Sequence, residues 1–323
     1  MKCIRFHEHG GPEVLRVEDC DPGKPACGEV QLRHSAVGVN YIDVYDRTGL
    51  YPGELPSGVG REAAGVVIAL GSNVRGLRVG ARVAYVDSKP GAYCDVRNVP
   101  AERLVKVPRD ISDEQAAAIM LKGLTARALL RRTYRVRRGD VLLVHAAAGG
   151  VGVILTQWAK ALGATVIGVV GSEAKAELAR RHGCRHVLIR GRDELVESVR
   201  KLTRGAGVAA VYDSVGRDTF MASLDCLRPL GLMISYGNAS GPPPPISPLE
   251  LAKRGSLYLT RPTLISYIAR RADLDVAVRE LFSAVRAGVV RVKIGQRYPL
   301  AEAAAAHRDL EARRTTGSTV LIP

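Results

Sequence analysis

The chain has 323 residues, 46% of them hydrophobic, and a formal net charge of +15 at pH 7. This length accommodates two domains with substantial cores, and the composition excludes a disordered chain. No uncharged apolar stretch reaches the roughly eighteen residues that a membrane span needs, and the opening MKCIRFHEHGG carries charges where a signal peptide has its apolar centre. We therefore expect a cytoplasmic protein that does not associate with membranes.

The basic charge and the cysteines point to no particular ligand. Arginines are spread over most predicted helices and loops, which favours an arginine-rich composition over a clustered nucleic-acid footprint, although attraction to a polyphosphate cofactor is compatible with either. The cysteines form no C-x-x-C pair and have no histidine nearby at ligand spacing. We expect inert or buried thiols rather than disulfides or a structural zinc. They are Cys3, Cys20, Cys27, Cys94, Cys184 and Cys226.

The first hundred or so residues predict a compact β-rich unit. Short strand-like runs alternate with Gly, Pro and Asn: KCIRF, VLRVED, EVQLRHSAVGVN, AAGVVIAL, GARVAYV and GAYCDVRNV. A helix follows in SDEQAAAIMLKGLTARALLRR, where Ser112 is placed as the N-cap and Gln115 completes a capping box.

From Asp140 the pattern alternates between strand and helix. The predicted strands are VLLVHA, TVIGVV, HVLI, AAVYDSV and LMISYG, and a helical stripe of apolar residues around Trp158 follows the first of them. This alternation indicates a doubly wound parallel sheet. GNASGPPPPISP is then expected to be a loop, and the tail supplies two helices and a last strand, STVLI, that return to the first domain.

Residues 146–152, AAAGGVG, form a row of small side chains between a strand and a helix. Such a turn lets a diphosphate approach the main chain at the positive end of a helix. Aligned on G-x-G-x-x-G, the chain has Ala147, Gly149 and Gly152. The strand before it and the repeated strand-helix units after it favour dinucleotide binding over a merely close-packed turn.

The end of the second predicted strand favours NADP(H) over NAD(H). Ser172 and Lys175 offer a hydroxyl and a cation to a 2′-phosphate, and no acid stands at the strand end itself, although Glu173 is one step away. A solvated lysine is the alternative for Lys175. Arg190, after the third strand, is a second candidate partner for the phosphate.

These segments resemble the medium-chain dehydrogenase/reductase superfamily, and within it the NADPH:quinone oxidoreductases related to zeta-crystallin. The resemblance runs nearly end to end, through FHEHGGPEVL, NYIDVYDRTGLYP, GREAAGVVIALGSNVRGLRVGARV, AAAGGVG, YDSVGRDT and LEARRTTGS. It implies an α/β fold with a GroES-like β-rich catalytic domain, residues 1–122 completed by 268–323, around a Rossmann cofactor domain of doubly wound parallel sheet, residues 123–267. The active site is expected in the cleft between the two domains.

The resemblance also implies which residues surround NADPH. Those facing the nicotinamide and ribose would be Asn40, Tyr41, Ile42, Asp43, Val44 and Thr125. Those at the pyrophosphate would be Gly149, Gly150, Val151 and Gly152, and those at the adenosine phosphate Gly171, Ser172, Lys175 and Arg190. Later strand ends would add Ser214, Tyr236, Gly237 and Asn238, and the returning tail Arg313. Arg190 departs from the tyrosine that the family pattern has at that position.

The same comparison predicts that no metal is bound. Zinc-dependent relatives have G-H-E-x-x-G and a cysteine after the third strand, where this chain has Arg61 and Asn40. Arginine does not ligate metals and asparagine is a poor zinc ligand. The lobe with four clustered cysteines is also missing.

A quinone is an acceptor that needs no Lewis acid, because hydride addition gives an anion delocalised over an aromatic ring. Candidate hydrogen-bond donors on the expected loop NYIDVYDRTGLY are Asn40, Tyr45 and Tyr51, with Asp43 orienting its neighbours; ordinary packing is the alternative for each tyrosine. Lys122 is either a positive charge near the nicotinamide or a helix-end cation. The histidines, His34 and His145 among them, lack the partner spacing of a catalytic triad and are expected to be packing or surface residues.

The leading hypothesis is therefore an NADPH-dependent quinone reductase. The alternatives are an NADPH-dependent reductase of enones or enoyl (C=C) substrates, an RNA-binding protein of zeta-crystallin type, and an inactive structural protein that only binds the cofactor. GSLYLTRP, after the proline loop, predicts an exposed edge strand and hence a homodimer.

Overall fold

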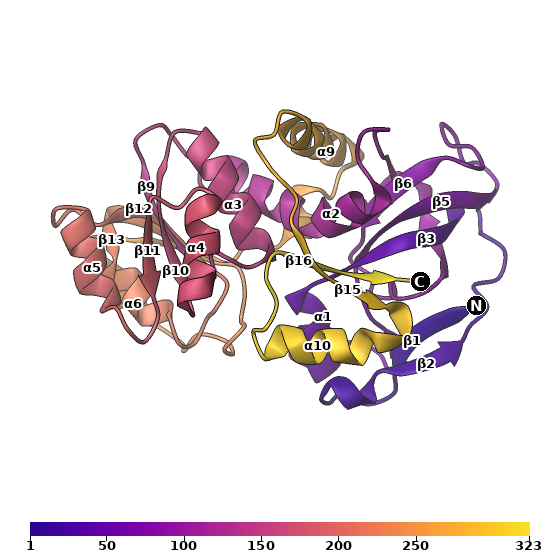
Figure 1. The fold of residues 1–323 in the computed structure, drawn as a ribbon, viewed down its shortest axis with the longest axis horizontal. Coiled ribbons are helices and arrows are strands. Elements are labelled where there is room, and N and C mark those ends of the chain that lie inside the picture. Colours follow the sequence, from indigo (N-terminus) through magenta and orange to yellow (C-terminus); the bar gives the residue numbers. More distant parts are fainter. The chain divides into compact units, whose positions relative to one another are not determined.

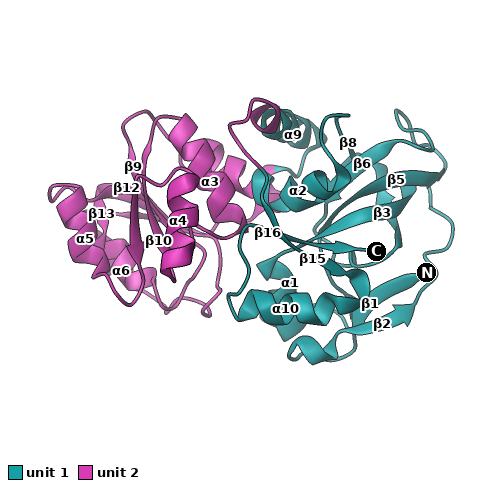
Figure 2. Ribbon diagram, viewed as in Figure 1, with its two compact units in different colours: residues 1–124, 268–282, 292–323 teal, residues 125–267, 283–291 magenta.

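The computed structural model describes all 323 residues, and Figure 1 shows the order of the elements along the chain. The chain forms two compact units, coloured separately in Figure 2. The first contains residues 1–124, 268–282 and 292–323, and the second contains residues 125–267 and 283–291. None of the helices combines the length and the apolar character that crossing a membrane would require.

The second unit is built on one parallel sheet of six strands. Their order is β11 (His186–Ile189), β10 (Thr165–Val170), β9 (Val141–His145), β12 (Val208–Asp213), β13 (Leu227–Ser235) and β14 (Tyr258–Thr260). In Figure 1, α3 (Gly150–Ala161) and α4 (Glu173–Arg181) lie on one side of this sheet, and α5 (Leu195–Leu202) and α6 (Phe220–Asp225) lie on the other. The predicted doubly wound parallel sheet is confirmed.

The topology of this sheet fixes where a ligand can meet the main chain. The strand order reverses at β9, because β10 lies on one side of it and β12 on the other. In open parallel sheets, ligands bind beyond the carboxyl ends of the strands at such a reversal. The core that holds the strands is apolar and includes Leu143, Ile167, Val211 and Met233.

The first unit contains two sheets that are mostly antiparallel. The larger has the order β15 (Ile294–Pro299), β16 (Ser318–Ile322), β3 (Glu29–Val39), β5 (Glu62–Leu70), β6 (Arg82–Val86) and β8 (Val105–Lys106), and β7 (Val96–Pro100) also pairs with β3. The smaller has β2 (Arg16–Asp19), β1 (Lys2–Phe6) and β4 (Ser57–Gly58). Its helices are α1 (Tyr41–Thr48), α10 (Ala303–Glu311) and most of α2 (Asp113–Ala128) and α9 (Arg271–Arg286), whose last residues belong to the second unit.

The predicted capping box at the start of α2 is confirmed. The Ser112 N–H donates to Gln115 Oε1 at 3.1 Å, and the Gln115 N–H donates to Ser112 Oγ at the same distance. α2 is followed by a π-helical turn, Leu129–Thr133. In the tail, α9 (Arg271–Arg286) and α10 are the two expected helices.

Three local expectations differ from the structure. The sequence predicts a loop at residues 40–51, but α1 forms there because Asp43 Oδ2 accepts the Asn40 N–H at 2.8 Å and Gly49, at φ 77°, ends the helix. The loop expected after β13 ends one residue early, since Pro248 begins α7 (Pro248–Lys253) with Ser247 as its N-cap. The sequence does not predict β15, because Gly and Pro interrupt its IGQRYP sequence and its pairing with β16 depends on a distant segment.

Candidate functional site

The turn between β9 and α3 brings main chain against main chain. Gly149 is the N-cap of α3, and no side chain caps the helix. A Cβ on Gly152 would lie 2.3 Å from Ala146 O and 2.8 Å from Ala147 Cα, which is too close for any side chain. Ala146 itself adopts a left-handed φ of 50°, and its carbonyl accepts the Gly149 N–H at 2.8 Å. The helix start is therefore bare, and its first N–H groups have no intrahelical acceptor.

Such a helix start fits a diphosphate. The N–H groups and the positive end of the helix dipole attract an anion, and the absence of side chains leaves room for one. The neighbouring strand β10 leaves room for this turn at Gly168. A Cβ on Gly168 would lie 2.9 Å from Ala147 Cβ, so a side chain there would displace Ala147. Gly149, Gly150, Val151 and Gly152 all lie in this turn and the first turn of α3.

The residues expected at an adenosine phosphate lie after β10 and β11. The Arg190 N–H donates to Val170 O at 2.9 Å, so Arg190 follows β11 beside the turn that contains Gly171 and Ser172. Ser172 is the N-cap of α4, and its hydroxyl oxygen accepts the Lys175 N–H at 3.4 Å. The structure thus brings a hydroxyl, the first turn of a helix and basic residues to one corner of the sheet.

The acids at this corner are engaged by arginines. Glu173 pairs with Arg180 at 3.3 Å and with Arg192 at 2.9 Å. Asp218 lies 4.0 Å from Arg190, and both side chains are partly exposed. Glu173, the acid nearest the end of β10, is therefore paired with two arginines.

Ser214 and Tyr236 to Asn238 follow the neighbouring strands β12 and β13. The two segments are in contact, since the Tyr236 N–H donates to Asp213 O at 2.7 Å and a Cβ on Gly237 would lie 2.6 Å from Ser214 O. The buried Asp213 carboxylate accepts hydrogen bonds from the Val215 and Gly216 N–H groups and from Thr219. Burial raises the pKa of Tyr236 to about 12, so this phenol remains protonated at neutral pH.

In the first unit, a buried carboxylate collects three donors around Asn40. Glu62 Oε1 accepts Asn40 Nδ2 at 2.8 Å and Lys122 Nζ at 2.9 Å, and Oε2 accepts the Leu121 N–H at 2.6 Å. Gly38 makes room, because a Cβ there would lie 2.3 Å from Glu62 Oε1. Lys122 lies inside α2 rather than at its end, so the helix-end interpretation is wrong and the lysine neutralises a buried acid.

A second buried chain of hydrogen bonds starts at Asp43. Tyr93 OH donates to Asp43 Oδ2 at 2.9 Å and lies 3.1 Å from His307 Nε2. His307 Nδ1 lies 3.1 Å from Arg47 Nη1, and Arg47 pairs with Glu311 at 2.8 Å. Because a guanidinium only donates, His307 Nδ1 must accept, and its Nε2–H donates to the Tyr93 oxygen.

Burial sets the protonation of this chain. It raises the pKa of Asp43 to about 7, with the neighbouring Asp46 adding to the rise, and it raises the pKa of Tyr93 well above its usual value. Burial and then the nearby Arg47 lower the pKa of His307 to about 3. The imidazole is therefore neutral at physiological pH, in agreement with the direction of its hydrogen bonds.

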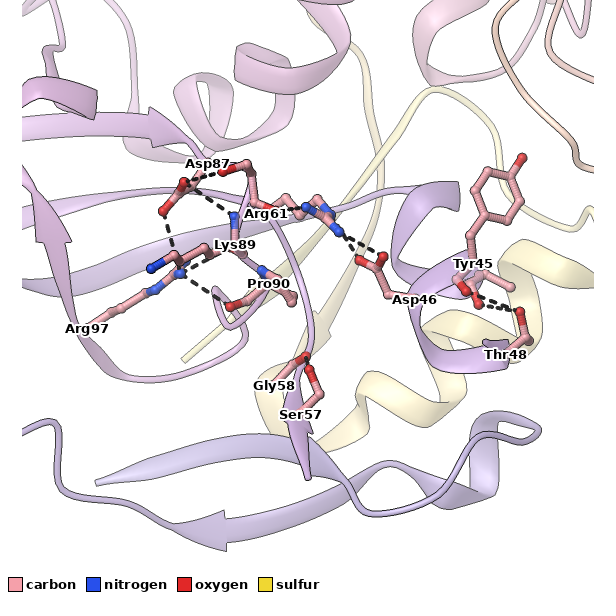
Figure 3. Close-up of polar contacts among 12 residues, drawn as sticks. Tyr45, Asp46, Thr48, Ser57, Gly58, Arg61, Asp87, Lys89, Pro90 and Arg97 are labelled. Carbon is pink, nitrogen blue, oxygen red and sulfur yellow. Dashed lines mark hydrogen bonds and ion pairs between the residues drawn. The ribbon is translucent and has the colours of Figure 1, made fainter. Parts of the chain in front are cut away.

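Figure 3 shows a third polar cluster, at the position where zinc-dependent relatives have a histidine. Arg61 forms a fork with Asp46, with Nε at 2.9 Å and Nη2 at 2.8 Å from its two oxygens, and also donates to Ser88 O. With Asn40 donating to Glu62, these residues do not fit a zinc ion, and no group of three His, Cys, Asp or Glu side chains is placed to hold one.

Comparisons with known proteins cover the whole chain. A family model described as "Zinc-binding dehydrogenase" matches residues 150–283, and one described as "Alcohol dehydrogenase GroES-like domain" matches residues 26–109. A quinone oxidoreductase of Pseudomonas aeruginosa is 51% identical, over 100% of this chain and 99% of its own. The chain belongs to the quinone oxidoreductase family. A crystal structure of Escherichia coli quinone oxidoreductase complexed with NADPH matches with a TM-score of 0.98 at 49% identity, covering 100% of both chains.

Another relative has a different name. A 2-haloacrylate reductase of a Burkholderia species is 48% identical, and the match covers 98% of each chain. The two family-model matches and the parallel sheet confirm the GroES-like and Rossmann-like character predicted for this member of the quinone oxidoreductase family.

The tyrosines expected near the acceptor form one aromatic group on and after α1. The rings of Tyr41 and Tyr45 are 5.4 Å apart, and those of Tyr45 and Tyr51 are 5.2 Å apart. Ile42 and Val44 lie on the same helix. Thr125 lies on α2, and Arg313 follows α10 with a left-handed φ of 59°. His34 and His145 are both buried, so of the two expected roles, packing or surface, they have the packing role. His145 Nε2 lies 2.8 Å from Ser223 Oγ.

Sequence reasoning missed the buried partners of these residues in the quinone oxidoreductase chain. Glu62 stands out in the sequence only as part of a motif, and Tyr93, His307 and Arg47 do not stand out at all. Their separation along the chain explains this, since Tyr93 and His307 are 214 residues apart. The available signal was the position of His307 on the apolar face of its helix, four residues after Ala303 and three before Leu310.

Replacing Asp43 with Asn tests how the ionisation of the buried Asp43 carboxyl changes the free energy of unfolding with pH. Its pKa is about 7 in the folded protein against an ordinary value of 3.8, so the folded state binds this proton more tightly than the unfolded chain does. Stability contributed by the protonated form is complete below about pH 4 and is lost as the pH rises to about 7, by up to about 1.4 kcal/mol per pH unit.

The measurement is the free energy of unfolding in urea across that pH interval. The wild type should lose stability relative to Asp43→Asn as the pH rises. Tyr93→Phe, which removes a donor that lowers the pKa of Asp43, should extend the loss to higher pH. A difference between wild type and Asp43→Asn that does not change with pH would contradict the assignment.

Proposed function

We propose that this chain is an NADPH-dependent quinone reductase that works without a metal. The observation that carries the proposal is the bare start of α3, where a Cβ on Gly152 would lie 2.3 Å from Ala146 O and no side chain caps the helix. This turn lies at the reversal of the parallel sheet, where dinucleotides bind in folds of this order. The NADPH complex of the Escherichia coli relative supports the choice of cofactor.

Each end of the cofactor has candidate partners. Gly149 to Gly152 would hold the pyrophosphate through main-chain N–H groups. Around the 2′-phosphate we place Gly171, Ser172, Lys175 and Arg190, and near the rest of the cofactor Asn40, Tyr41, Ile42, Asp43, Val44, Thr125, Ser214, Tyr236, Gly237, Asn238 and Arg313. Residues 1–122 with 268–323 would form the catalytic domain, and residues 123–267 the cofactor domain.

Bound NADPH supplies the hydride, and the chain supplies orientation, exclusion of water and hydrogen bonds. Asn40 is held by Glu62, and Asp43 caps the helix that carries Tyr45. We place Asn40, Tyr45 and Tyr51 as the donors nearest the acceptor, with Asp43 orienting them. A quinone suits such weak donors, since the anion that it forms is delocalised over its ring.

A reductase of activated C=C bonds is the second candidate. It is favoured by the 48% identity with the 2-haloacrylate reductase, whose substrate is named as a haloacrylate. Quinones and haloacrylates are both conjugated acceptors, so the same donors would serve either. The two functions are separated by the acceptor and not by the cofactor site.

The deciding experiment is the oxidation of NADPH by the purified protein with a panel of acceptors. The panel contains 1,2-quinones, 1,4-quinones, 2-alkenals, 2-haloacrylate and an enoyl thioester. We expect the highest kcat/KM with a quinone. Turnover of the C=C substrates alone would replace the quinone proposal with the second candidate, and no turnover with any acceptor would indicate an inactive binding protein.

Arg190→Gln tests the recognition of the 2′-phosphate. A charge-assisted hydrogen bond contributes about 1.5 to 3 kcal/mol, so the ratio of kcat/KM for NADPH to that for NADH should fall by about tenfold or more. The matched control is Arg181→Gln, which removes the same charge elsewhere: Arg181 is exposed on α4 and pairs with Glu177 at 3.6 Å. An unchanged ratio in Arg190→Gln would remove Arg190 from the site.

We also propose that the protein is a homodimer. β14 is the last strand of its sheet and pairs only with β13. Its residues Tyr258 and Leu259 are 61% and 40% exposed, and the nearby Leu230, on the paired strand, is 65% exposed. An exposed apolar edge favours pairing with a second copy about a twofold axis.

Sedimentation at micromolar concentration should give twice the chain mass of 34.6 kDa. Leu259→Lys places a charge on the edge strand and should shift the protein to monomer. Val276→Lys, on the exposed face of α9, is the matched control and should leave the mass unchanged. A monomeric wild type would refute the dimer.

A cytoplasmic location fits this activity, since NADPH is an intracellular reductant. Weak RNA binding is the alternative of a different class, and the net charge of +15 is the observation behind it. Binding of generic RNA that falls steeply with salt and competes with NADPH would support it.

A further inference from the structure

Cys3 and Cys94 face each other across an isolated antiparallel bridge between β1 and the segment before β7. On either side of the pair, the Ile4 N–H donates to Tyr93 O at 2.8 Å and the Asp95 N–H donates to Lys2 O at 2.9 Å. This is the pattern of a pair without mutual hydrogen bonds, in which the Cα atoms lie about 4.5 Å apart and the side chains leave the same face.

That spacing is compatible with a disulfide. Two bridged cysteines have Cα atoms about 4.4 to 6.8 Å apart, so no large main-chain movement is needed. Both side chains are buried, Cys3 at 7% exposure and Cys94 at 4%, and both are free thiols. The Cys94 thiol donates to Gly91 O at 3.4 Å, and a rotation about its Cα–Cβ bond would turn it toward Cys3.

A third thiol connects the pair to solvent. Cys20 directly follows β2, and its N–H donates to Met1 O at 2.9 Å, which continues the pairing of β1 and β2. Cys20 lies two residues after Glu18, which is paired with Cys3, so the Cys20 and Cys3 side chains leave the same face of β1 and β2 as diagonal neighbours. Cys20 is less buried than either partner. Because Cys3 and Cys94 are buried and Cys20 is partly exposed, an oxidant that arrives from solvent meets Cys20 first.

We propose that Cys20, Cys3 and Cys94 form a thiol relay that ends in a reversible Cys3–Cys94 disulfide. Hydrogen peroxide oxidises the Cys20 thiolate to a sulfenic acid and is itself reduced to hydroxide, which takes up a proton to become water. The Cys3 sulfur attacks the Cys20 sulfur, and the second water leaves with the Cys3 proton. Cys94 then attacks the Cys3 sulfur, and its proton passes to the released Cys20 thiolate. Two thiols and one peroxide thus give one disulfide and two waters.

The Cys3–Cys94 pair lies next to a residue of the buried hydrogen-bond chain in the first unit. Tyr93 precedes Cys94 in the chain, and its hydroxyl donates to the carboxylate of Asp43. A bond between Cys3 and Cys94 would fix β1 to the segment that carries this tyrosine. Transient disulfides of this kind in reducing compartments are typical of redox sensing rather than of structural bridges.

The test is oxidation of the full-length protein by hydrogen peroxide, followed by alkylation and peptide mapping without reductant. The expected product is a linked pair of peptides that carry Cys3 and Cys94, with an intact-mass loss of about 2 Da that dithiothreitol reverses. Cys20→Ser should slow its formation by roughly tenfold, because the entry thiolate is lost. In Cys94→Ser the product should stop at a Cys3–Cys20 link.

Cys27→Ser is the matched control, since Cys27 is an exposed thiol outside the relay, and it should leave the rate unchanged. The proposal is overturned if Cys20 is consumed while Cys3 and Cys94 remain fully alkylatable. It is also overturned if Cys20→Ser forms the Cys3–Cys94 link at the wild-type rate. The mass and mapping measurements on the wild type need no variant to fold.

Discussion

The close approach of Gly152 to the carbonyl of Ala146 is the constraint on which the second unit depends. It seats α3 against the end of β9 and leaves the first N–H groups of the helix without side-chain partners. Any Cβ at Gly152 would push helix and strand apart. A neighbouring glycine, Gly168, extends the same close packing to β10. The site that we assign to a diphosphate is therefore a property of main-chain geometry, and side chains contribute by being absent.

The interior of the first unit, in contrast, contains charged side chains that need polar partners. Glu62 is acceptable there since Lys122, Asn40 and a main-chain N–H together satisfy its oxygens. Removing one partner of such a buried pair typically costs about 3 to 5 kcal/mol. Asp43 instead accepts hydrogen bonds from neutral donors, which do not fully compensate for the burial of its charge. Its pKa is therefore raised. These two networks meet at Asn40, which gives this residue a fixed orientation.

The fixed orientation of Asn40 and the bare turn after β9 fit different roles for the two units of this member of the quinone oxidoreductase family. In our proposal, the second unit provides the site for the diphosphate and the 2′-phosphate, and the first provides the oriented weak donors. Arg61, paired with Asp46, fills the position at which zinc-dependent relatives place a ligand. A delocalised product anion needs no stronger electrophile than such donors, so the residues at this position and the proposed substrate class agree.

Sequence alone determined the parallel sheet, the bare turn at residues 146–152 and the capping box at Ser112, because each depends on residues close together in the chain. Sequence alone did not predict α1, because its tyrosines and β-branched residues are not typical of a helix, and Asn40 and Asp43 start it as a capping box. It also could not give the partners Glu62 and Lys122, Tyr93 and His307, or Cys3 and Cys94. Those pairs join distant segments, and only the packing of strands and helices decides which buried polar groups meet.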